Sequence, residues 1–320
     1  DETNIGDSSV QCDNDMTFIH ANDNNFIGTV VQSNDASGSG DADFTQNNNI
    51  PSINQVVVAG NDCDQTDQQT AQGSNEAGCS NDEPGNIISS LTQDNDATGT
   101  HVDDIFQDNI GSFSQAMTVN NDCDATTFTD DGDNSAECNN DRAQNFIGPV
   151  DQTNDATGND DVLIDQDNNL DVSQTLTAIN NCDSTALSDA ECSNFEAGNF
   201  IEDIEQANTA TGDDCAQIFQ SNDATIVQTA NLLNSCGESG VGVSNVVCDN
   251  DSDPVLDFHN LIGPIEQSNT AIATGNTVAT QSNVIDVTQN LQGTNDCDEA
   301  NTGDNFADCS TSVFNRIESI

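Results

Sequence analysis

Lysine is absent from this chain of 320 residues, and Arg142 and Arg316 are its two basic residues apart from three histidines. Against them stand 57 acidic residues, which give a formal net charge of -55. Nucleic acids and anionic membranes bind proteins through basic patches, so we expect neither as a partner. An acidic surface of this density repels itself unless cations screen or bridge it, and cations are therefore the expected small partners.

Long apolar runs are also missing, and no stretch reaches the length of a membrane span. The first residue is Asp rather than Met, which favours a processed, secreted chain. The 12 cysteines form an even, regular set, as in the disulfide framework of a protein from an oxidising compartment. We therefore expect an extracellular protein that is not anchored to lipid.

Repeats decide between order and disorder. Low hydrophobicity with high charge is typical of a disordered acidic coat. However, close copies of NFIGPVDQTNDATG, which starts at Asn145, begin at Asn25, Asn86, Asn199 and Asn260. They define units of roughly sixty residues, a period typical of stacked repeat folds. The prediction is a single repeat domain over 1–320, with repeats at 12–78, 79–137, 138–191, 192–247 and 248–308 and a partial repeat at 309–320.

Alternation with a period of two predicts strands in every repeat. In the third repeat, the series of alternate residues that starts at Cys138 includes Phe146 and Val150, which are expected to face inward. Two strands of equal length flank an Ala-Thr-Gly turn. We predict an all-β fold, a β-arch or β-solenoid with two facing sheets, and a hairpin within one sheet is the alternative. Pro51 marks an expected bulge, and Pro149 and Pro264 predict a break in the first strand.

Glutamine and asparagine occupy inward positions beside the turn of each repeat. Stacking of the repeats at strand spacing places Gln over Gln and Asn over Asn, so that buried amides hydrogen-bond along the stack. The first strands supply these predicted amide ladders at Gln32, Gln93, Gln152, Gln206, Gln267, Asn34, Asn95, Asn154, Asn208 and Asn269.

Two disulfide schemes fit the cysteine spacing, and the sequence leaves both open. Within the arches, the pairs are Cys12–Cys63, Cys79–Cys123, Cys138–Cys182, Cys192–Cys236 and Cys248–Cys297. Across the loops, they are Cys63–Cys79, Cys123–Cys138, Cys182–Cys192, Cys236–Cys248 and Cys297–Cys309. Each scheme leaves Cys215 and one terminal cysteine over. The first leaves Cys215 and Cys309, which predicts that these two form a disulfide between subunits.

Metal binding and catalysis have little support. Asp249, Asp251 and Asp253 alternate as at the start of an EF-hand loop, but Pro254 stands where Gly is needed and Asn260 where a bidentate Glu is needed. Acidic loops of this kind are candidates for weak binding of Ca²⁺ or other cations, and no other cofactor is expected. The carboxylates lie in turns and at outward positions, where a solvated acidic face is the ordinary explanation, so no enzymatic activity is predicted.

The segments QSNDASG, QDNDATG and QTNDATG, each followed by a second Gln-x-Asn, resemble the inward Gln and Asn of curli-type amyloid repeats. Acidic, lysine-free repeats with cysteines are similar to the amyloid-like sheath proteins of filamentous methanogenic archaea. The resemblance implies a structural subunit of an extracellular sheath or filament that polymerises with itself. The alternative is a monomeric cation-binding or adhesive cell-surface protein with the same fold.

Overall fold

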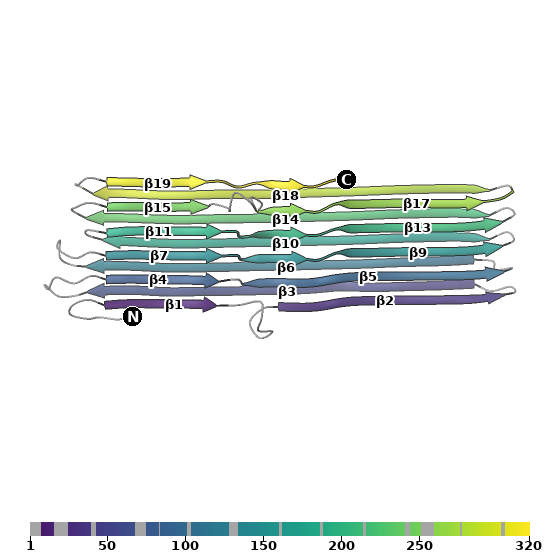
Figure 1. Cartoon of the computed structure of the whole chain (residues 1–320), viewed down its shortest axis with the longest axis horizontal. Helices are drawn as coiled ribbons and strands as arrows, with labels where there is room; N and C mark the ends of the chain where they lie inside the picture. Colours follow the sequence, from purple (N-terminus) through teal and green to yellow (C-terminus); the bar gives the residue numbers. More distant parts are fainter. Residues whose placement is uncertain are drawn as a thin grey trace.

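The computed structural model describes the chain except residues 1–7, 16–24, 40–42, 68–74, 83, 101–103, 128–133, 160–161, 186–187, 214–215, 241–243, 251–258, 276 and 302–304. The described part contains 20 strands and no helix. The strands form three sheets in which every pair of neighbours is parallel (Figure 1). The predicted all-β repeat fold is thus confirmed.

Each coil of the solenoid runs through the three sheets in the same order. The short-strand sheet contains β1 (Ser8–Asp15), β4 (Asn75–Asp82), β7 (Asn134–Asp141), β11 (Ser188–Phe195), β15 (Ser244–Asn250) and β19 (Asn305–Thr311). The split sheet follows, with β2 (Asn25–Ser39), β5 (Gly85–Thr100), β8 (Gln144–Ile147), β9 (Val150–Asn159), β12 (Gly198–Ile201), β13 (Ile204–Asp213), β16 (Asn260–Ile262), β17 (Ile265–Ala273) and β20 (Asn315–Ile317). The long-strand sheet closes each coil with β3 (Asp43–Asp67), β6 (Asp104–Thr127), β10 (Leu163–Thr185), β14 (Gln217–Gly240) and β18 (Val278–Asn301).

The coils stack in register, so that equivalent residues lie above one another. Cys182 of β10 pairs with Cys123 of β6 and with Cys236 of β14, and Gln166 of β10 pairs with Gln107 and Gln220 in the same way. The two strands that flank each turn, for example β9 and β10, belong to different sheets, as an arch requires and a hairpin forbids. The arch is therefore the correct alternative.

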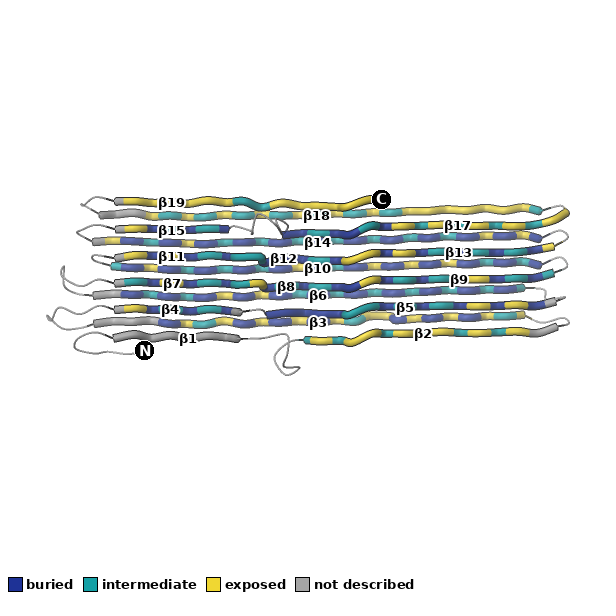
Figure 2. The backbone as a smooth tube through the Cα atoms, viewed as in Figure 1, coloured by how far each residue is buried: buried dark blue, intermediate teal, exposed yellow. Residues whose placement is uncertain are grey.

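The short-strand and split sheets together form one layer of the solenoid, and the long-strand sheet forms the other. Apolar and amide bands alternate in the interior between these two layers. Along β10, Ile164, Leu170 with Val172, Leu176 with Ala178, and Cys182 belong to four separate apolar clusters. Between them lie buried Gln and Asn side chains, at Gln166, Asn168, Gln174 and Asn180. Figure 2 shows the resulting alternation of buried and exposed residues along the inner strands. Apolar burial is thus divided into thin bands, and each band borders on amides that need hydrogen bonds.

Two residues change the alternation of inward and outward side chains between the short-strand sheet and the split sheet. Arg142 (φ 51°) and Glu196 (φ 50°) adopt the left-handed conformation between short-strand and split-sheet strands. A single residue of this kind shifts the inward phase by one. Asn145 and Ile147 consequently face inward, whereas Phe146 lies on the outer face. The prediction that Phe146 belongs to the core is wrong, while Val150 is buried as expected.

The expected irregularities at proline are present. The register of β3 against β6 shifts between Ile50 and Ile53, so Pro51 sits in the predicted bulge on an edge strand, where a missing N–H is tolerated. β8 ends at Ile147 and β16 at Ile262, two residues before Pro149 and Pro264. The predicted strand breaks are thus confirmed.

Five disulfides join each long strand to the short strand of the next coil. They are Cys63–Cys79, Cys123–Cys138, Cys182–Cys192, Cys236–Cys248 and Cys297–Cys309, with Cα–Cα distances from 6.1 to 6.7 Å. The two layers approach this closely because the inward side chains at this end are small, mostly Ala and Cys. Each bond spans 10 to 16 residues of sequence. Pairing across the loops closes shorter segments than pairing within the arches and so loses less chain entropy.

The scheme across the loops is therefore the one observed. Cys309 bonds Cys297 within the chain, so the predicted intermolecular role of Cys309 is wrong. The backbone of Cys12 is in register with Cys79, and Cys215 lies outside the described residues.

Replacement of both Cys123 and Cys138 by Ala should lower the free energy of unfolding by about 3 kcal/mol, the chain-entropy value for a loop of about 15 residues. Urea unfolding of the variant and of the parent chain measures this loss. Peptide mapping of the parent chain without reductant checks which cysteines are bonded to each other. Recovery of a Cys79–Cys123 peptide in place of Cys63–Cys79 and Cys123–Cys138 would contradict the scheme.

Candidate assembly interface

The five predicted glutamines form one continuous column through the split sheet. Nε2 of Gln93 donates to Oε1 of Gln32 at 2.8 Å, and Gln152 donates to Gln93 at the same distance. Gln206 and Gln267 continue the column at 2.8 and 2.7 Å. The second proton of each inner amide goes to a backbone carbonyl of the facing long strand, for example from Gln152 to Asn169 at 3.1 Å. Neighbouring coils and the facing strand thus supply the hydrogen-bond donor and acceptors that a buried amide requires.

The predicted asparagines form a double column together with those of the long strands. Nδ2 of Asn154 donates to Oδ1 of Asn208 in the next coil at 3.0 Å. It also contacts Oδ1 of Asn168, across the arch, at 3.0 Å. Asn168 in turn donates to Asn208 and to Asn222, at 3.0 and 2.9 Å. The two layers are therefore connected by amides as well as by apolar contacts.

A further ladder is not in the predicted set. It runs through Asn25, Asn86, Asn145, Asn199, Asn260 and Asn315, with side-chain hydrogen bonds between neighbours of 2.8 to 3.0 Å. In the third and fourth repeats, alternate residues counted from Cys138 and Cys192 pass over Asn145 and Asn199, because the inward phase shifts at Arg142 and Glu196. The signal available in the sequence was the Asn that opens every copy of the repeated segment.

Glutamine and asparagine columns donate in opposite directions. Each Gln of the column that contains Gln152 donates to the preceding coil, and the same holds for the columns of Gln166 and Gln174. Each Asn donates to the following coil, as Asn154 does to Asn208. Backbone carbonyls fix both orientations, since only the NH₂ group of an amide donates a hydrogen bond to them.

The columns run to open strand edges at both ends of the described structure. β1, β2 and β3 form the N-terminal edge, and β17, β18, β19 and β20 form the C-terminal edge. The described residues of β2, β17, β18, β19 and β20 are more exposed than those of the inner coils (Figure 2). Within the described residues, Oε1 of Gln267 is buried and accepts no hydrogen bond. One ladder thus ends at the C-terminal edge on an unsatisfied acceptor.

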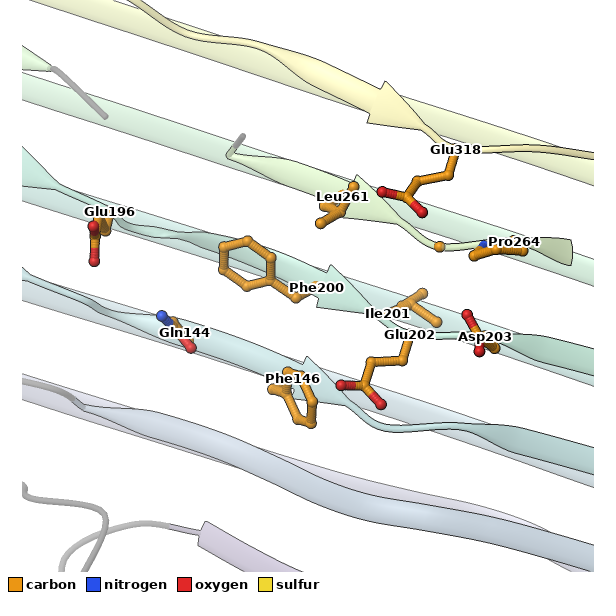
Figure 3. A pocket seen from close by; sticks show the side chains of 11 residues that line it. Gln144, Phe146, Glu196, Phe200, Ile201, Glu202, Asp203, Leu261, Pro264 and Glu318 are labelled. Carbon is orange, nitrogen blue, oxygen red and sulfur yellow. The ribbon is translucent and has the colours of Figure 1, made fainter. Parts of the chain in front are cut away.

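A hollow of about 540 Å³ lies on the outer face of the split sheet, beside the breaks that follow β8, β12 and β16. Phe146, Phe200 and Leu261 lie in one register column along it, and Glu202 and Glu318 lie at its rim (Figure 3). Its lining residues include no Cys, Ser, His, Lys or Arg. Its ionisable lining residues are the carboxylates Glu196, Glu202, Asp203 and Glu318.

The structure describes one of the three metal candidates. Asp249 lies in β15, where its Oδ1 accepts a hydrogen bond of 2.5 Å from Ser310, and Asp251 and Asp253 lie outside the described residues. Among the residues described, no group of three or more His, Cys, Asp and Glu side chains is arranged to hold a metal ion. Binding of Ca²⁺ stays a prediction.

Comparisons of the chain with models of protein families, with curated proteins and with solved structures find no match. No helix in the described part of the chain is suited to crossing a membrane. Five disulfides are typical of a protein from an oxidising, non-cytoplasmic compartment.

Carboxylates on the outer faces lie close enough to disturb one another. Partial burial raises the pKa of Asp167 to about 6, and the charges of Asp165 and Asp108 add to the rise. Burial and the neighbouring Asp165 raise the pKa of Asp108 as well. On the split sheet, burial raises the pKa values of Asp94 and Asp155, with a further contribution from Asp96. In-register stacking places like charges in columns on the outside and identical amides in columns on the inside.

Gln152→Leu should lower the free energy of unfolding by about 2–4 kcal/mol, because it removes a buried amide and leaves ladder partners unsatisfied. The matched substitution Gln32→Leu, in the same column at the edge, should cost about 1 kcal/mol or less, since Gln32 has one ladder neighbour and is partly exposed. Urea unfolding measures both. Equal losses at the two positions would show that the ladder contributes nothing beyond packing.

Acidification should stabilise the fold. The pKa of Asp167 is higher in the folded chain than its ordinary value of 3.8, so the folded state binds the proton more tightly. The destabilising contribution of this charge is complete above about pH 6 and disappears as the pH falls toward 3.8. Asp167→Asn should therefore raise stability at pH 7 and reduce the gain between pH 7 and pH 4, as measured by urea unfolding. The control Asp171→Asn removes the same charge from an outward position of β10. An identical response of the two variants would rule out the proposed role of the site at Asp167.

Proposed function

We propose that this protein is a structural subunit of an extracellular sheath or filament, and that copies polymerise by stacking their end coils edge to edge. The observation that carries the proposal is the run of in-register amide ladders that ends at open strand edges on both sides. Edge strands present unpaired N–H and C=O groups, which invite pairing with another chain.

The two edges lack the features that protect sheet edges from pairing in monomeric proteins. Such proteins commonly blunt an edge with lysine, short strands or a covering helix. Lysine is absent here, β3 and β18 have 25 and 24 residues, and the described residues include no helix. Pro51 and its bulge interrupt one edge strand locally and leave most of β3 regular.

The interior also favours repetition over a catalytic or carrier role. Each amide is satisfied by the coils on either side of it, so an end coil gains hydrogen bonds when another copy covers it. The free energy of such a stack is approximately the sum of a contribution from each coil and a contribution from each contact between neighbouring coils. A further coil therefore adds the same favourable contact as the one before it. The hollow beside Phe146 and Phe200 offers no group for acid–base or nucleophilic chemistry beyond carboxylates.

The acidic outer columns give cations a part in the assembly. Copies with a formal charge of -55 repel one another across any junction, and salt or divalent ions screen that repulsion. The five disulfides within each copy would hold the coils together outside the cell, where chaperones and ATP are absent.

The purified protein should form tubes or fibres as the salt or Ca²⁺ concentration rises, and chelation should loosen any assembly bridged by Ca²⁺. Electron microscopy gives the morphology. X-ray diffraction should give a spacing of about 4.7 Å along the stack and about 10 Å across the layers. Discrete particles at all salt concentrations would refute the proposal and favour a monomeric cell-surface protein.

A further inference from the structure

We propose that copies join head to tail, with the β2–β3 arch of one copy stacked on the β17–β18 arch of another, so that the polymer has a polar axis. This inference rests on the proposed function and specifies the partner and the orientation of the contact. The occupant of the C-terminal edge is thus the N-terminal edge of a second copy of this chain.

The hydrogen-bonding groups at the two edges are complementary. At the N-terminal edge, Gln32 and Gln46 end columns whose other glutamines donate toward that edge, so they present NH₂ groups. At the C-terminal edge, Gln267 and Gln281 are the last donors of the same columns and present their Oε1 atoms. The unsatisfied Oε1 of Gln267 is the acceptor that a second Gln32 would meet.

In the asparagine columns the arrangement is reversed, with acceptors at the N-terminal edge and donors at the C-terminal edge. Asn34 donates into the stack, to Asn95, and presents Oδ1 at the N-terminal edge. Asn269 accepts from Asn208. Its NH₂ group donates to the carbonyl oxygen of Ser282 and to Oδ1 of Asn283, as the NH₂ groups of the inner asparagines do before they also reach the following coil. One head-to-tail contact therefore matches donors with acceptors in both kinds of column at once.

Contact between two like ends cannot reproduce this match. It would place donor on donor in the glutamine columns, and each unpaired buried group costs about 1–3 kcal/mol. It would also reverse the strand direction across the junction, whereas every pair of neighbouring strands in the three sheets is parallel. Side chains outside the centre of the contact would then lose their register.

The C-terminal edge is stepped, which locates the contact. β19 and β20 pair with β15 and β16, whereas no described strand covers the outer edges of β17 and β18. A stack that continues the register brings the incoming β1 to the position of β19 and the first residues of the incoming β2, Asn25–Ile27, to the position of β20. Cys297–Cys309 holds β19 in place, so the incoming β1 and the start of β2 give way, and the contact forms where the rest of β2 faces β17 and where β3 faces β18.

Two matched variants test the polarity. Gln32→Lys and Gln267→Lys place a cation at opposite ends of the same column, where it stays hydrated in the free protein and opposes stacking in the polymer. Ser33→Lys and Thr270→Lys are the controls, because they add the same charge at exposed outward positions of β2 and β17. Circular dichroism and urea unfolding establish that all four variants fold. Light scattering coupled to size-exclusion chromatography measures the assembly state.

Under conditions in which the unmodified chain polymerises, each ladder variant alone should remain monomeric, and a mixture of the two should yield dimers. Each variant keeps one intact edge, and in the mixture these edges are complementary. The control variants should polymerise like the parent chain.

The failures are distinguishable. Dimers of either ladder variant on its own would overturn the head-to-tail orientation and leave polymerisation standing. Unimpaired polymers of both ladder variants would overturn the arch as the contact. A parent chain that stays monomeric under all conditions, with no dimer in the mixture, would overturn the proposed function together with the orientation.

Discussion

In-register parallel stacking is the constraint on which the rest of this structure depends. It places each side chain above its own equivalent, so every position has to be compatible with a copy of itself. Cysteine, alanine and the branched apolar residues meet this requirement through packing, and glutamine and asparagine meet it because an amide carries both a donor and an acceptor. Carboxylates do not meet it. Glu238 is buried, whereas the carboxylates with raised pKa values lie at outward positions, where partial burial and like charges raise the pKa of Asp167 and of Asp108.

The same constraint explains how a chain of low hydrophobicity folds. The apolar bands are narrow, and each is bordered by amides that would be costly to bury alone. Stacking makes those amides stabilise the fold, because an inner amide such as Gln152 is hydrogen-bonded to the coils on both sides of it. Small residues at the cysteine end bring the layers close enough for disulfides. Order thus arises from repetition rather than from a large core.

Period-two alternation and identical spacing allowed the arch, the ladders through Gln152 and Asn154 and the bulge at Pro51 to be predicted from the sequence. The inward face of the segment around Phe146 was not predictable in the same way. Its phase depends on the backbone conformation of Arg142, a residue type that rarely adopts positive φ. The disulfide partners were also undetermined, because both schemes join a short strand to a long strand at the same end of the fold, and they differ in whether the two strands belong to one coil or to consecutive coils.

Antiparallel donor directions in the glutamine and asparagine columns have an electrostatic consequence for length. Aligned peptide units sum to a macrodipole in an α-helix, and a column of amides pointing one way would do the same. Here the columns of Gln152 and Asn154 run side by side with opposed dipoles, and their fields largely cancel. A solenoid of this kind therefore accumulates less partial charge at its tips as it lengthens than one whose amide columns all point the same way.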